Sequence, residues 1–223
     1  MKKLLLPVLF ALTLTACGNT TSVSMNAKFD TNGKDDKAEL VLATKKIITR
    51  RLAMHEADLV DFDVQYKDDN SVDITVKGSD ADATKAMLDA MTQSFNLEIR
   101  KNVPEHQDGD ITVEKLGDFR ETGINGDDIS WVLSRASDNA LDHGEVMMQF
   151  TEEGSKKMNT LFQENVGVNI GLFVRGQLAA NFAIPNGGFE DSIIIPNIPS
   201  VEMAEIFADD MNVGTNMIFT QSQ

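Results

Sequence analysis

Residues 62–76 read FDVQYKDDNSVDITV, and this stretch decides the fold that the sequence predicts. On both sides of its charged middle, Lys67-Asp68-Asp69-Asn70, apolar residues alternate with polar ones. Such alternation is typical of a strand with one buried face, and Asp and Asn are typical of turns. The stretch therefore predicts a β-hairpin.

The elements on either side of the hairpin complete a first domain. Residues 23–29 alternate like a strand, and residues 36–54 place their apolar side chains on one helical stripe. After the hairpin, Ser79 and Asp82 resemble a capping box that opens a second helix, and a last strand carries residues 95–99. The order β-α-β-β-α-β predicts a ferredoxin-like domain, with two helices on one face of a four-stranded antiparallel sheet.

A polar stretch with Pro104 and Gly109 predicts that this ferredoxin-like domain covers residues 22–103 and that a second, smaller α+β domain covers residues 104–223. In the second domain, Gly126-Asp127-Asp128 predicts the start of a short helix through Ala136. Periodicity predicts the remaining elements, which are strands at 111–116, 146–150 and 192–195, a helix at 151–166, a hairpin at 168–184, a helix that Ser200 caps and Gly214 ends, and an edge strand at 218–219.

The amino terminus carries a targeting signal. Lys2 and Lys3 precede the apolar residues 4–14, a run of about half the length that a membrane-spanning helix needs. The run ends at Leu14-Thr15-Ala16-Cys17, which resembles a bacterial lipobox. We expect a signal peptide over residues 1–16, lipidation of Cys17, and a tether over residues 17–21 that holds the chain in the envelope, facing the periplasm, with the outer membrane favoured over the inner. An ordinary signal peptide with a chance cysteine is the alternative.

Composition disfavours several classes of function. The chain has 20 Lys and Arg against 35 Asp and Glu, and the resulting net charge of -15 disfavours nucleic acid as a partner. A single cysteine excludes an intramolecular disulfide and a zinc site built on several Cys ligands. The sequence also lacks the motifs of serine nucleophiles, zinc proteases and phosphate-binding loops, so we expect no catalytic residue, metal or cofactor, and no enzyme activity. Paired carboxylates such as Asp127-Asp128 fit caps and turns better than acid–base chemistry.

Two blocks of the sequence carry a known pattern. The first runs from Ile47-Ile48-Thr49-Arg50-Arg51-Leu52 through the hairpin to residues 83–100, and the second begins with Ile124-Asn125-Gly126-Asp127-Asp128-Ile129 and continues through the turn in residues 172–180. Together they resemble the first periplasmic domain of the SecD/SecDF protein-export family. The resemblance implies a base before about Val103 and a head after it, and in that family the head is thought to hold the exported polypeptide.

The resemblance also has limits. Asn181 and Phe182 stand where the family usually has Ala-Pro, and the membrane helices that carry the family's proton path have no counterpart in this sequence. The expected function is therefore that of a stand-alone, lipid-anchored lipoprotein that binds extended or unfolded polypeptide, or export-machinery components, without coupling to the proton gradient. An envelope scaffold that docks a folded protein complex is the alternative function.

Four aromatic residues are candidate partner contacts, because large apolar side chains anchor many interfaces. They are Trp131, the only tryptophan, and Phe173, Phe182 and Phe189. Packing in a core or between domains is the alternative for Trp131, and core packing is the alternative for the three phenylalanines.

Overall fold

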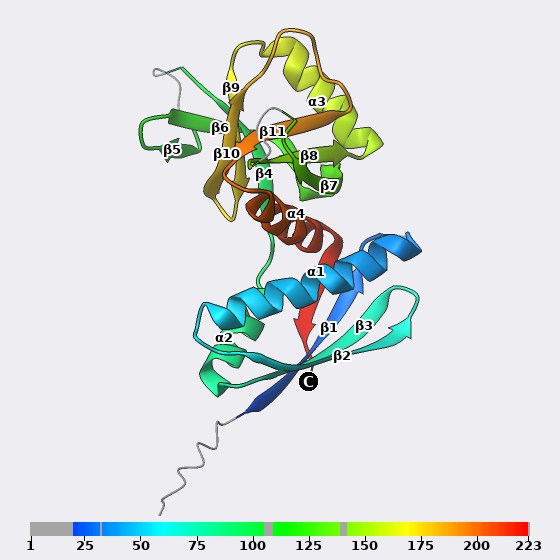
Figure 1. Ribbon diagram of the computed structural model, residues 1–223. Coiled ribbons are helices and arrows are strands. Elements are labelled where there is room, and N and C mark those ends of the chain that lie inside the picture. The colour runs from blue at the N-terminus through cyan, green and yellow to red at the C-terminus, as the bar shows by residue number, and fades with distance from the viewer. Residues whose placement is uncertain (1–19, 32, 105–108, 139–141, 223) are drawn as a thin grey trace, which may run out of the picture.

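The computed structural model describes residues 20–31, 33–104, 109–138 and 142–222. These residues form two lobes on either side of the helix α4 (Val201–Asn216) (Figure 1). The predicted signal peptide, Cys17 and most of the tether lie outside the described residues. Strands and helices both contribute to each lobe, so the expected α+β class is confirmed.

The first lobe contains the predicted hairpin. Its elements are β1 (Thr21–Phe29), α1 (Lys34–Ala53), β2 (Leu59–Asp68), β3 (Ser71–Gly78), α2 (Ala81–Met91) and β12 (Met217–Gln221). β2 and β3 pair antiparallel with Val64 opposite Ile74, and the four strands lie in the order β12-β1-β3-β2. Val72, Ile74 and Val76 are fully buried because the alternation of β3 turns them towards the helices.

The start of α2 differs from the predicted capping box. The carboxylate of Asp80, not the hydroxyl of Ser79, accepts the backbone N–H of Ala83 at 2.8 Å. The Ser79 hydroxyl instead accepts the backbone N–H of Asp58 at 2.8 Å, so it fixes the loop that enters β2.

The strand predicted to complete this sheet lies in the other lobe, and the prediction of its partners is wrong. β4 (Leu97–Asn102) pairs with β6 (Gly117–Asn125) and β9 (Asn169–Val174). The place beside β1 is taken by β12, with Phe219 opposite Ala27. The expected ferredoxin-like order therefore holds locally only for the β-α-β-β-α segment. Alternation shows which face of a strand is buried, but it does not show which strand will lie beside it.

The second lobe contains a five-stranded sheet in the order β10 (Gln177–Ala183), β9, β4, β6, β5 (Ile111–Val113). It also contains a three-stranded sheet in the order β11 (Ser192–Ile198), β8 (Gly144–Phe150), β7 (Ile129–Ala136). The side chains of Met148, Met158 and Ile170 are fully buried in one core that both sheets and two helices share. The second lobe also contains a 3-10 turn, η1 (Gly126–Asp128), and a helix, α3 (Glu152–Glu164).

The helix predicted after Gly126 is absent, and that prediction is wrong. Asn125 and Asp128 cap each other's backbone, which closes a single 3-10 turn, and the chain then extends into β7. In β7, Val132 lies opposite Met148 of β8, and this pairing overrides an apolar spacing that also suits a helix.

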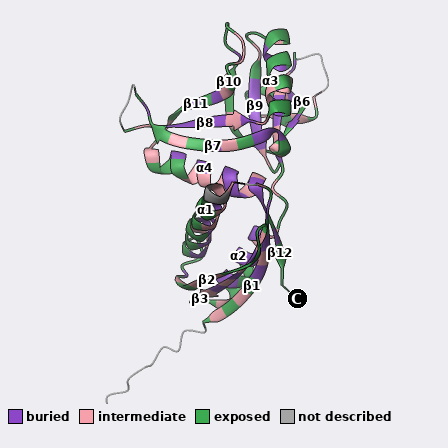
Figure 2. Cartoon of the chain, turned by 90° about the vertical axis from the view of Figure 1, so that its right-hand side faces the viewer, coloured by how far each residue is buried: buried purple, intermediate pink, exposed green. Residues whose placement is uncertain are grey.

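The last helix, α4 (Val201–Asn216), lies between the lobes (Figure 2). Ser200 caps it as predicted, because its hydroxyl accepts the backbone N–H of Met203 at 3.1 Å. Gly214 does not end the helix. The ring of Phe95 packs against it so closely that a Cβ there would lie 2.3 Å from the Phe95 Cγ, so this glycine serves close packing. α4 contacts α1 on one side and β7 and β8 on the other.

Candidate functional site

A cleft of about 850 Å³ opens where the two lobes meet. Its walls come from α1, from the end of α2 and the connection to β4, from the turn between β9 and β10, and from α4 and β12. Ligand sites commonly have volumes of about 300–1,000 Å³ and lie between domains. This cleft is therefore the candidate functional site.

The walls of the cleft are largely apolar. Met203 is 50% exposed and lies one helical turn from Phe207 on α4, so both side chains lie on the same side of the helix. Ile218 of β12 is 59% exposed, so its side chain is open to contact from outside the chain. Further apolar lining comes from Ile47, Met91, Phe95, Ile206 and Met217. Methionine adapts to irregular partners, so these walls suit a variable apolar ligand.

Two arginines also line the cleft, and the first is Arg51 in the last turn of α1. Its Nη1 atom is buried and has no hydrogen-bond partner within the described chain. Burial lowers the pKa of Arg51, while the attraction of Asp210 opposes that change. The preceding residue behaves differently, because Arg50 contacts Asp209 at 3.4 Å and Asp210 at 3.1 Å and so ties α1 to α4.

The second arginine is Arg175, in the turn between β9 and β10. It has a left-handed backbone with φ of 51°, a conformation that non-glycine residues seldom adopt. Its backbone N–H donates to the Asn96 carbonyl at 2.7 Å, and its Nη2 makes long contacts of 3.4 Å to the Ala90 carbonyl and 3.5 Å to the Gln93 carbonyl. The turn is thus anchored to the connection between the lobes, with its guanidinium at the cleft.

Three carboxylates face the same cleft, those of Asp30, Asp127 and Asp210. Burial raises the pKa of Asp210, against the opposing attraction of Arg50. Asp210 is already paired with Arg50, so it does not fully satisfy Arg51.

The free edge of β12 borders the cleft. Asp30 donates its backbone N–H to the Asn216 carbonyl, and Ser222 donates to the Ser24 carbonyl, so even-numbered residues of this segment face β1. Antiparallel pairing alternates, and the backbone groups of Phe219 therefore point away from β1. Nothing in the described part of the chain bonds to them. An open strand edge is a template for another extended chain.

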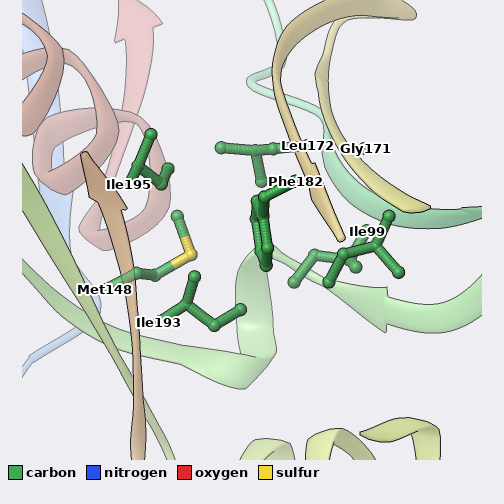
Figure 3. Close-up of a pocket in the computed structure, with 8 residues that line it drawn as sticks. Ile99, Met148, Gly171, Leu172, Phe182, Ile193 and Ile195 are labelled. Carbon is green, nitrogen blue, oxygen red and sulfur yellow. The ribbon is translucent and has the colours of Figure 1, made fainter. Parts of the chain in front are cut away.

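A much smaller void of about 10 Å³ lies in the second lobe, and Figure 3 shows its lining. Ile99, Met148, Ile193, Ile195 and Phe182 surround it, without a polar atom at its wall. A buried water needs at least about 10–15 Å³ and polar partners. This void is a packing defect of the core and does not offer a ligand site.

The structure does not gather the four aromatic candidates into one surface. Trp131 is half-buried on β7 and packs against the core of the first lobe, so it lies between the lobes. Phe173 is fully buried, edge to face with Phe119 at 5.3 Å. Its prediction as a partner contact is therefore wrong, and the alternative of core packing describes it.

Phe182 and Phe189 are half-buried against the core of the second lobe, and the Phe189 ring lies 5.5 Å from the Phe150 and Phe162 rings. Along the described wall of the cleft, none of the four candidates contributes lining. Aromatic side chains suit cores as well as interfaces, and Phe173, Phe182 and Phe189 all pack in or against the interior of the second lobe.

The residues that sequence reasoning missed are Arg51 and Arg175. The sequence places Arg51 within the predicted helix at 36–54 and Arg175 within the predicted hairpin at 168–184, and it singles out neither. Only their positions in the fold bring them to one cleft.

Among the described residues, no three His, Cys, Asp or Glu side chains lie close enough together to hold a metal ion. Asp128, from one of the carboxylate pairs, is buried and receives the Lys157 ammonium at 2.8 Å. The helices described here include none with the length and apolar character that crossing a bilayer requires.

Comparison with known proteins gives a likeness of fold. No family model matches the chain, and no curated protein matches its sequence. A crystal structure of SecDF in a super-membrane-facing form has a TM-score of 0.52 at 17% identity, over 92% of this chain and 30% of that one. A second structure, of the membrane component SecDF that enhances protein export, has a TM-score of 0.50 at 15% identity, over 91% of this chain and 98% of that one.

The predicted resemblance to SecD is thus confirmed at the level of the fold. The chain spans less than a third of the length of the first of these two structures.

Proposed function

We propose that this chain binds extended polypeptide segments in the cleft between its lobes, in association with protein export. The observation that carries the proposal is the combination, at one place, of an apolar cleft of about 850 Å³ and the free edge of β12. The SecDF structure that shares this fold belongs to a membrane component that enhances protein export, which supports the export association.

The cleft suits a polypeptide in two ways. Strand addition satisfies the backbone of an extended ligand, because the free N–H and C=O groups of Phe219 can pair with it. Side chains of the ligand can then contact Ile218 on β12 and the apolar face of α4 at Met203 and Phe207. The backbone pairing is independent of sequence and methionine contacts are adaptable, so we propose a binder of many segments rather than of one.

The remaining parts of the proposal concern location and chemistry. The chain is held in the bacterial envelope by lipid on Cys17 and faces the periplasm. It acts without a cofactor and without catalysis, and it has no proton-driven stroke of its own. Cys17→Ser tests the anchor by cell fractionation. The variant is expected in the soluble fraction, and continued residence in the membrane contradicts the proposed anchor.

Peptide titration tests the binding. The full chain in nonionic detergent is titrated into fluorescein-labelled extended peptides of about ten apolar and small residues, and fluorescence anisotropy is measured. Ile218→Glu is expected to weaken binding about tenfold, since it places a charge where apolar contact is lost. Val60→Glu is the matched control, because Val60 is a 50% exposed β-branched residue on β2, the opposite edge strand.

Two outcomes contradict the proposal. Equal loss in both variants places the binding elsewhere than in the cleft. Absence of binding to every peptide by a natively folded chain rules out the polypeptide function, and co-purification of one folded envelope protein would then favour the scaffold.

A further inference from the structure

We infer that the cleft prefers polypeptide segments that carry a carboxylate among apolar residues, and that Arg51 and Arg175 bind this carboxylate. The inference rests on the proposed polypeptide binding and names the chemistry of the segment that the cleft selects.

The first observation is the unsatisfied donor of Arg51. Buried side-chain donors are nearly always hydrogen-bonded, and an exception calls for a physical explanation. Arg51 Nη1 is buried at the wall of the cleft and has no partner in the described chain. Asp210, whose negative charge attracts Arg51, is held by the Arg50 Nη2 at 3.1 Å. A group from outside the chain can therefore provide the missing acceptor.

The second observation is the neighbouring Arg175. Its guanidinium is close enough to Arg51 for the two charges to repel, which contributes to the lowered pKa of Arg51. The guanidinium of Arg175 donates to two backbone carbonyls, at 3.4 and 3.5 Å, and no carboxylate among the described residues forms an ion pair with it. Two like charges at one apolar cleft favour an anion between or beside them.

The acidic groups around the cleft narrow the choice of anion. Asp30 and Asp127 also line it, and the whole chain carries a net charge of -15. The negative charge of the chain repels a strongly acidic segment before it reaches the cleft. A segment with one carboxylate among apolar residues is repelled much less and still gains the contact with the two arginines. Arginine also binds carboxylates through two parallel hydrogen bonds, which adds geometric selectivity.

The carboxylate can come from an Asp or Glu side chain or from the end of a polypeptide. Four labelled peptides of one apolar sequence separate these sources. Three are amidated at the C-terminus and carry Glu, Gln or Lys at the central position, and the fourth carries Gln and a free C-terminal carboxylate. Anisotropy is measured with the full chain in nonionic detergent.

The Glu peptide is expected to bind about tenfold more tightly than the amidated Gln peptide, and the Lys peptide more weakly than both, since a charged hydrogen bond is being gained or opposed. A gain for the Gln peptide with a free terminus supports the same inference and identifies the polypeptide end as a ligand. In Arg51→Gln the ratio of Glu to Gln affinities falls to about 1, and Arg175→Gln lowers it in the same direction.

Lys85→Gln is the charge-matched control. Lys85 is exposed on α2 and lies outside the cleft, so the ratio should stay near tenfold. Equal binding of the Glu and amidated Gln peptides to the unmodified chain, with no gain from the free terminus, overturns the inference and leaves polypeptide binding intact. If none of the four peptides binds, the proposed function itself fails.

Discussion

The two lobes differ in where along the chain each takes a strand that completes its sheet. The first lobe uses β12, which follows the elements of the second lobe. The second lobe uses β4, which directly follows α2 of the first lobe. Each lobe thus depends on a strand that sequence order would give to the other. The chain crosses between the lobes twice, once through residues 92–96 and once through α4 into β12.

The two crossings surround the candidate site. Residues 90–95 and 213–219 both line the cleft, so the crossings that hold the lobes together also form its walls. A ligand in the cleft therefore contacts both lobes. Changes to either crossing should alter the stability of a lobe and the shape of the cleft together.

The largest expected effect follows from removing residues 217–223. The deletion takes away β12 with two nearly buried side chains, Met217 and Phe219, and its backbone pairing to β1. Together these losses amount to about 5 kcal/mol, comparable to the whole stability of a small domain. Hydrogen exchange should show rapid exchange in the first lobe's β1 and β3, with protection kept in the second lobe's β8 and β9.

Removal of residues 222 and 223 alone is the control for this deletion, because β12 remains whole. Loss of protection in both lobes at once would show that they fold as a single unit and would remove the contrast between them.

A smaller effect is expected at the contact between α4 and the second lobe. The side chain of Asn212 accepts the Val132 backbone N–H and donates to the Val132 carbonyl, both at 2.7 Å and both buried. Asn212→Ala leaves two backbone groups of β7 unsatisfied, which costs about 3 kcal/mol. Urea denaturation measures this loss. Glu205→Ala, on an exposed part of the same helix, should change stability little, and equal losses in both variants would contradict the role of Asn212.

The sequence predicts the local elements of this fold better than it predicts which strands pair. The hairpin of β2 and β3, the stripe of α1 and the cap of α4 follow from local spacing, and all are present. The partners of β4 and β12 depend on strands distant in sequence, and spacing alone carries no information about them. β7 was mistaken for a helix because apolar residues at 129, 132, 133 and 136 fit a helical stripe until β8 lies beside them.

The candidate site was less predictable than the fold. Arg50 and Arg51 are neighbours with the same local context, yet one pairs with α4 while the other has a buried donor without a partner in the described chain. This difference arises only where α1, α4 and the β9–β10 turn come together, far apart in sequence.

The packing of the two crossings against each other can be tested at Gly214, which lies on α4 in the second crossing and contacts Phe95 of the first. Gly214→Ala brings a Cβ to 2.3 Å from the Phe95 ring, and the ring must move. We expect a net loss of about 1–2 kcal/mol, because the strain exceeds the better helix propensity of alanine. In a Phe95→Ala background the same change should instead stabilise the chain by about 1 kcal/mol, because only the propensity remains. Loss of stability in both backgrounds would show that Phe95 is not the cause.

The smallest expected effect concerns pH and is confined to the second lobe. The Ser137 hydroxyl and then the Arg135 guanidinium, at 2.8 and 2.9 Å, hold the pKa of Glu145 below its ordinary value. The folded chain therefore favours the charged carboxylate. Its contribution to stability is present above the ordinary pKa near 4.5 and is lost as pH falls through the lower, folded value.

The difference in free energy of unfolding between the unmodified chain and Glu145→Gln should accordingly shrink as pH falls through this range. Urea denaturation at a series of pH values measures this difference, and hydrogen exchange at the same pH values shows which strands are affected. Ser137→Ala keeps the charge but removes its largest stabilising contact, and it should show part of the same pH dependence. Because Glu145 lies on β8, the effect should appear in the protection of β7, β8 and β11 and leave β1 and β3 unchanged. A matching change in the first lobe would mean that α4 and its ion pairs couple the lobes tightly enough for protonation in one lobe to destabilise the other.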